Sequence, residues 1–164
     1  MIILLKNKQA LKIDDHILRC VIGKNGLTSK KKEGDKKTPK GTFAIGNLYY
    51  RKDRIAYLET KLKTIQIKRY MGWCDDTSSS KNYNKPIKIP NTLKHEKLFR
   101  KDHSYDYFIS INYNTKNIKP NKGSAIFIHL TKNYKPTAGC IALKKKDFLI
   151  LIKLINKKTK IKIY

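Results

Sequence analysis

The chain has 164 residues, 40% of them hydrophobic, which is enough to bury a core without disulfides or metal and excludes a disordered polymer. Its formal net charge of +26 at pH 7 comes from 38 Lys and Arg against 12 Asp and Glu. Arg stands only at positions 19, 51, 54, 69 and 100, whereas Lys is spread along the whole chain. Because Arg makes the bidentate contacts that read nucleic acids, we expect non-specific attraction to polyanions and no specific nucleic-acid partner.

Short extended segments rich in Ile, Tyr, Thr and Phe dominate the chain and end at turn residues. We expect strands at residues 2–5, 17–22, 41–45, 55–58, 64–67, 107–111, 124–129, 141–143 and 159–164. The stretches 29–40 and 75–85 are polar and are expected to be long loops. Binding residues usually lie on such loops.

One helix is predicted over residues 145–156, where Phe148, Leu151 and Ile152 belong to a wide apolar face and Asp147 falls in the first turn. No internal repeat or linker divides the chain. The sequence therefore predicts a single domain over residues 1–164, mainly β with one or few helices (α+β), whose sheet is mixed and mostly antiparallel.

No segment approaches the ~18 to 20 apolar residues of a membrane span. The apolar stretch within residues 1–6 is shorter than the roughly 7 to 15 residues of a signal-peptide core and has no basic leader. From these residues alone we expect a cytosolic chain without a transmembrane segment.

The three cysteines, Cys20, Cys74 and Cys140, form no C-x-x-C pair and have no zinc-like spacing. We therefore expect no metal, and the chemistry described next requires no organic cofactor. Cys20 lies in an apolar run and is expected to be a buried core residue. Cys74 lies beside Trp73, ahead of two aspartates, and its role stays open.

A histidine and a cysteine stand at opposite ends of one connection that contains Gly and Pro. The apolar run 124–128 is expected to be a buried strand that delivers His129 at its end, and residues 141–143 are expected to be the next strand. If the loop folds back, the imidazole can take the proton of Cys140 or pair with its thiolate, which makes a nucleophile. Gly139 permits a tight turn whose amide N–H groups form an oxyanion hole. We expect a backbone carbonyl to hold the second imidazole nitrogen.

Other polar and aromatic residues are candidates for the same site. Asp75 and Asp76 either bind an ammonium group of a ligand, for which a carboxylate is the natural partner, or cap a turn. Trp73 either forms an apolar wall beside the polar loop 75–85 or packs in the core. His103 lies either at the rim of a pocket or on the surface.

These residues resemble the catalytic signature of the YkuD-type L,D-transpeptidases, in which a histidine-ended strand is followed by a [Ser/Thr]-x-Gly-Cys turn, here Thr137-Ala-Gly-Cys140. The segment Glu33-Gly-Asp-Lys-Lys-Thr-Pro-Lys-Gly-Thr-Phe43 is similar to the upstream family motif E-G-D-x-x-T-P-x-G-x-F. Gly72-Trp-Cys-Asp-Asp76 and Tyr105-Asp-Tyr107 resemble one branch of the family. The resemblance implies a β-sandwich or barrel-like catalytic domain.

The resemblance also implies an activity: a cysteine acyltransferase that acts on peptidoglycan stem peptides in the periplasm or cell envelope. It would work through a Cys140 thioester with His129 as base, react with carbapenems, and bind substrate near Thr137 and Ala138. Many members carry a histidine where Ala138 stands and an arginine where Ala142 stands. Any part those two residues play in binding a peptide carboxylate must fall to other groups here.

Three alternatives stay open. Water instead of an amine could resolve the thioester, which would make the chain an L,D-carboxypeptidase that trims the same peptides. The chain could be a non-catalytic basic module that binds polyanions through its lysines. It could also keep the enzyme fold without the activity, since Ala138 and Ala142 depart from the usual pattern.

Overall fold

Strands make up most of the chain in the computed structural model, which describes residues 1–164 apart from the side chain of Lys6. The strands are β1 (Ile2–Lys6), β2 (Ala10–Ile13), β3 (His16–Val21), β4 (Leu27–Thr28), β5 (Thr38–Pro39), β6 (Gly41–Tyr50), β7 (Thr64–Gln66), β8 (Met71–Cys74), β9 (Pro86–Lys88), β10 (His95–Lys97), β11 (Tyr107–Ile111), β12 (Phe127–Leu130), β13 (Ile141–Leu143) and β14 (Lys160–Ile163). The helix of the described residues is α1 (Lys145–Leu154). Among these residues no helix has the length and apolar character that crossing a membrane demands.

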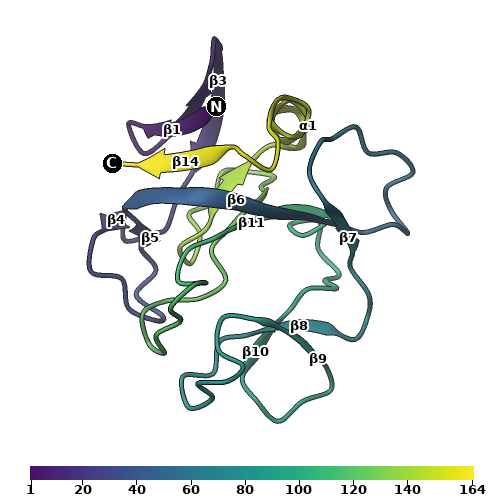
Figure 1. Cartoon of the computed structure of the whole chain (residues 1–164). Helices are drawn as coiled ribbons and strands as arrows, with labels where there is room; N and C mark the ends of the chain where they lie inside the picture. Colours follow the sequence, from purple (N-terminus) through teal and green to yellow (C-terminus); the bar gives the residue numbers. More distant parts are fainter.

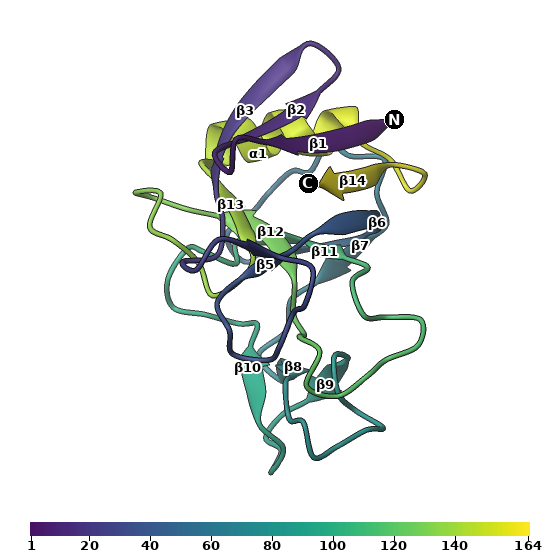
Figure 2. The ribbon, with the colours of Figure 1, turned by 90° about the vertical axis from the view of Figure 1, so that its left-hand side faces the viewer.

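Nine strands form a mixed sheet in the order β11-β12-β13-β3-β2-β1-β14-β6-β7, and β11 also pairs with β6. This extra pairing joins distant strands of the sheet, so that the sheet closes into a barrel-like layer (Figures 1 and 2). The pairs β1–β14, β12–β13 and β6–β7 are parallel, and the remaining pairs of this sheet are antiparallel. The predicted mainly β class with a mixed, mostly antiparallel sheet is confirmed.

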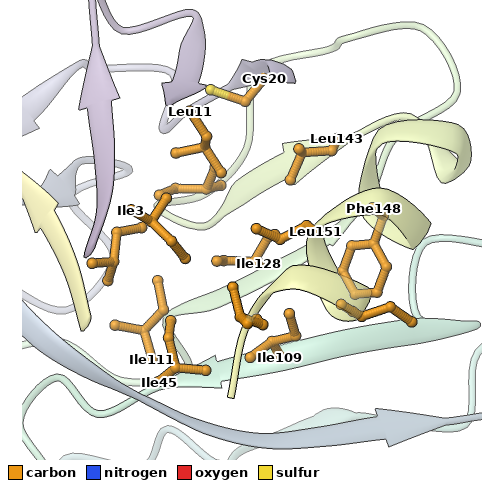
Figure 3. Close-up of a cluster of buried hydrophobic side chains, with 14 of the residues drawn as sticks. Ile3, Leu11, Cys20, Ile45, Ile109, Ile111, Ile128, Leu143, Phe148 and Leu151 are labelled. Atoms are coloured by element: carbon orange, nitrogen blue, oxygen red, sulfur yellow. The ribbon is translucent and has the colours of Figure 1, made fainter. Parts of the chain in front are cut away.

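The larger apolar core lies between the strands of this sheet and α1. Side chains of Ile3, Leu11 and Ile128 point toward Phe148 and Leu151 of the helix (Figure 3). The last two stand at i and i+3, on one face of the helix. The helix begins where it was predicted but ends at Leu154, because the backbone of the next residue is extended.

A second apolar cluster covers the other side of β12, where a small three-stranded sheet of order β10-β8-β9 packs below the barrel (Figure 1). Ile128 belongs to the first core and its neighbour Phe127 to the second. Both faces of β12 are therefore buried, which explains why this segment is a continuous apolar run rather than an alternating one.

Two expectations about local structure were wrong. Residues 55–58 form bends and irregular backbone instead of a strand: Ile55 is buried and Leu58 packs against the core, but Tyr57 is exposed, so the run does not alternate as a strand would. Residues 124–126 are irregular, so the strand expected at 124–129 begins only at Phe127. Trp73 and Cys74 lie in strand β8. Both of these side chains are buried, and the Trp73 indole packs edge-on against Phe127.

Candidate active site

Cys140 and His129 line the same cavity, which has a volume of about 580 Å³. Of the other residues predicted for the site, Thr137, Ala138, Gly139 and Asp75 line it too. The fold therefore brings together six of the nine residues selected from the sequence. The charged and polar residues that complete the lining include Lys31, Glu33, Lys94, Glu96, Arg100, Tyr105, Ser124, Lys132 and Lys135.

The parallel pairing of β12 with β13 explains why the two candidate catalytic side chains reach the same cavity. In this register His129 lies beside Ala142, and Ile128 lies beside Ile141. Because side chains alternate along a strand, Cys140 projects to the same face as Ala142 and lies diagonally from the histidine. The small side chain of Ala142 leaves space beside the imidazole.

The imidazole of His129 is held in one orientation. Its Nδ1 lies 2.9 Å from the backbone oxygen of Leu130, which confirms the expected carbonyl partner. This contact makes Nδ1 the protonated nitrogen and leaves Nε2 as an acceptor. Burial lowers the pKa of His129 to about 4, and the positive charge of Arg100 acts in the same direction. The imidazole is therefore neutral at pH 7 and able to accept a proton.

The Cys140 thiol is also neutral at pH 7. Burial raises its pKa to about 12, with a smaller contribution from the negative charge of Glu96. The sulfur donates to the backbone oxygen of Ala125 at 3.2 Å and accepts from the N–H of Phe127 at 3.3 Å. The burial of both groups in one cavity favours a neutral thiol and a neutral imidazole over a preformed thiolate–imidazolium ion pair, so the thiol proton must leave during attack.

The turn before the cysteine is rigid. Thr137 Oγ1 donates to the carbonyl oxygen of Cys140 at 2.6 Å and accepts from the N–H of Gly139 at 3.1 Å. Gly139 has a φ of +141°, a conformation that favours glycine. A Cβ there would lie 2.9 Å from the backbone oxygen of Lys37, so the turn packs directly against the segment that contains β5.

Sequence reasoning missed several polar residues that line the cavity. Glu33 accepts from Ser124 Oγ at 2.7 Å and from the buried hydroxyl of Tyr83. Lys31, whose side chain is 4% exposed, forms a 2.5 Å ion pair with Asp35. The resemblance of segment 33–43 to the family motif was the available signal for Glu33, whereas Lys31 and Ser124 lie outside that segment.

Asp75 is the candidate carboxylate that reaches the cavity. Its Oδ1 is buried without a hydrogen-bond partner among the described residues, and its Oδ2 lies 3.9 Å from Lys94 Nζ. Burial raises the pKa of Asp75, and the charge of Glu33 adds to that effect. A carboxylate oxygen without a hydrogen bond is suited to a cationic group of a ligand.

Three predicted substrate-binding residues do not line the cavity. Trp73 is buried in the second apolar cluster, and its indole N–H donates to Asn84 Oδ1 at 3.0 Å. Asp76 caps a turn by accepting from Ser78 and from the N–H of Lys94. The side chain of His103 is 80% exposed and pairs with Asp106.

A barrel-like sheet that directs a cysteine and a histidine into one cavity defines a candidate thiol-dependent enzyme. The family model for the YkuD L,D-transpeptidase catalytic domain matches residues 2–163, and the chain belongs to this family. Comparison with curated proteins gave no match.

Two solved structures resemble this fold. The helical cell shape determining protein Pgp2 from Campylobacter jejuni is 17% identical, with a TM-score of 0.50 over 99% of this chain and 46% of that chain. The structure of Bdellovibrio bacteriovorus Bd1075 is also 17% identical, with a TM-score of 0.49 over 99% of this chain and 47% of that chain. The chain thus spans about half the length of these proteins.

Proposed function

We propose that this chain is an L,D-transpeptidase that transfers acyl groups between peptidoglycan stem peptides through a thioester on Cys140. The observation that carries the proposal is the shared cavity, in which His129 keeps Nε2 free on the same strand face as the thiol. Membership of the family supports a peptidoglycan peptide as the substrate.

The neutral pair determines the order of proton movements. As the sulfur attacks the carbonyl of a diamino-acid residue, the S–H turns away from the Ala125 oxygen and its proton passes to Nε2 of His129. The tetrahedral intermediate then collapses, the imidazolium gives its proton to the departing amine, and a D-amino acid leaves. An acceptor amine, deprotonated by the same imidazole, attacks the Cys140 thioester and releases the free thiol.

Three carboxylates in the lining of the cavity support a diamino-acid donor. Asp75, Glu33 and Glu96 face this cavity in a chain whose net charge is +26. Each of these carboxylates can pair with the ammonium group at the end of such a side chain, within a lining that also contains five basic residues. Asp75 is the principal partner, because its Oδ1 has no other hydrogen bond among the described residues.

The test is an incubation with a defined tetrapeptide and an acceptor amine, followed by mass spectrometry of both protein and peptides. The expected result is an acyl adduct on Cys140 and a cross-linked product, both of which are lost in Cys140→Ala. Cys20→Ala is the matched control, because Cys20 is equally buried but lies in the barrel core.

The products also separate the alternatives. A trimmed tripeptide without cross-link would show that water resolves the thioester, and the transferase would then be a carboxypeptidase. A wild-type protein that forms no adduct with the peptide or with a carbapenem would overturn the proposal and favour a non-catalytic basic module.

A further inference from the structure

Thr38 is fully buried in β5 and contacts the catalytic turn from 101 positions earlier in the sequence. Its hydroxyl donates to the carbonyl oxygen of Gly139 at 2.8 Å and accepts from the N–H of Gly23 at 2.9 Å. Because an amide N–H can only donate, the single hydroxyl proton is committed to the Gly139 carbonyl. The hydroxyl therefore holds the peptide group between Gly139 and Cys140 in one orientation.

That peptide group also contains the N–H of Cys140. In a trans peptide the carbonyl and the N–H lie in one plane and point in opposite directions. Holding the Gly139 oxygen therefore fixes the direction of the Cys140 N–H. Gly139 and Cys140 line the cavity and Thr38 does not. The carbonyl of Gly139 therefore faces Thr38, and the N–H of Cys140 points away from Thr38.

The two N–H groups of the turn are not equivalent. The N–H of Gly139 is already bonded to Thr137 Oγ1. The N–H of Cys140 has no acceptor among the described residues. It is therefore the available donor for an oxyanion that forms next to the sulfur, as acyl transfer requires.

Backbone hydrogen bonds hold Thr38 itself in place. The N–H of Thr38 donates to the Gly26 oxygen at 2.8 Å, and the N–H of Thr137 donates to the Ile22 oxygen at 3.0 Å. These contacts tie β5 and the catalytic turn to the same part of the chain. A preorganised donor is effective because it needs no reorganisation when charge develops.

We propose that Thr38 is a positioning residue that aims the backbone N–H of Cys140 at the oxyanion of the acyl-transfer intermediate. This role rests on the proposed function, since only reactions that form an oxyanion at Cys140 depend on it. Displacement at a saturated carbon by the same sulfur does not.

That difference defines the experiment. The wild-type protein, Thr38→Val and Thr38→Ser are treated separately with a carbapenem, which acylates the thiol through an oxyanion, and with iodoacetamide, which alkylates it without one. Intact-mass spectrometry with peptide mapping gives both rate constants for Cys140. Loss of a whole oxyanion donor costs about 100- to 1,000-fold, so loss of its alignment in Thr38→Val should slow acylation by about 10- to 100-fold.

Alkylation of Thr38→Val should stay within about twofold of wild type, and Thr38→Ser should restore acylation, because serine keeps the hydroxyl. Thr159→Val is the matched control: Thr159 is fully buried and its Oγ1 accepts from the N–H of Asn156 at 3.0 Å, but it does not line the cavity. It should leave the ratio of the two rates unchanged. If Thr38→Val does not fold, Thr38→Ala replaces it, because alanine adds no methyl group facing the Gly23 N–H.

Equal slowing of both reactions, or of neither, would overturn the role of Thr38. A wild-type protein that is alkylated but never acylated would overturn the proposed function itself, and the role of Thr38 with it. The two failures are therefore distinguishable in one set of measurements.

Discussion

The protonation state of His129 sets the lower end of the pH range in which Cys140 can be acylated. His129 must be neutral to accept the thiol proton, and burial lowers its pKa to about 4. The rate of carbapenem acylation should therefore be flat from pH 7 to about 5 and fall below about pH 4, by tenfold per pH unit. A decline centred at the ordinary histidine value of ~6.5 would contradict this.

The same shift affects stability. The unfolded chain takes up the histidine proton at about pH 6.5, whereas the folded chain does so only near pH 4. The contribution of His129 to stability is present above pH 6.5 and is lost as the pH falls through this window. Trp fluorescence must therefore be followed beside the acylation rate, so that unfolding is not mistaken for loss of the base.

Asp75 allows a prediction about substrate choice. Asp75→Asn should raise KM for a substrate with a diamino-acid side chain by about 10-fold, since a charge-assisted hydrogen bond contributes about 1.5 to 3 kcal/mol. Alkylation by iodoacetamide should not change. Asp76→Asn is the neighbouring control, because the carboxylate of Asp76 bonds to Ser78 and Lys94 away from the cavity. Equal effects of both substitutions would exclude an ammonium site at Asp75.

The packing of α1 on the strands of the barrel stabilises the core, and substitutions in the helix measure how much. Leu151 is fully buried between the helix and the strands. Leu151→Ala should lower the free energy of unfolding by about 2 to 5 kcal/mol, because it leaves a cavity in the core. Urea denaturation measures this loss. Lys153→Ala, which removes an exposed pair with Glu59, should cost less than about 1 kcal/mol.

The elements also show what the sequence could and could not predict. Strands 107–111 and 141–143 have the predicted bounds, because buried residues fill these runs. The polar segment His95–Lys97 gave no strand signal, since it becomes β10 only by pairing with β8. Likewise His129 and Cys140 share one connection and were found from their spacing, whereas Thr38 and Glu33 reach them only through tertiary packing.

The whole molecule carries a net charge of +26, and five basic and three acidic side chains line the cavity. The lysines are spread over the sequence, which is suited to non-specific attraction to polyanions and not to recognition of one partner. Binding to an anionic polymer such as polyphosphate should therefore weaken by at least about tenfold between 50 and 200 mM NaCl.

This attraction and the chemistry of the cavity should be separable. Cys140→Ser should bind polyphosphate with the same salt dependence as wild type, because the charge of the chain is unchanged. Polyphosphate should in turn leave the rate of iodoacetamide alkylation of Cys140 unaltered, since Cys140 is buried and a highly charged polymer would have to lose its hydration to reach the thiol. Titration calorimetry and intact-mass kinetics measure the two effects. Protection of Cys140 by the polymer would show instead that the polyanion enters the cavity, and the separation of surface binding from the chemistry of the cavity would be wrong.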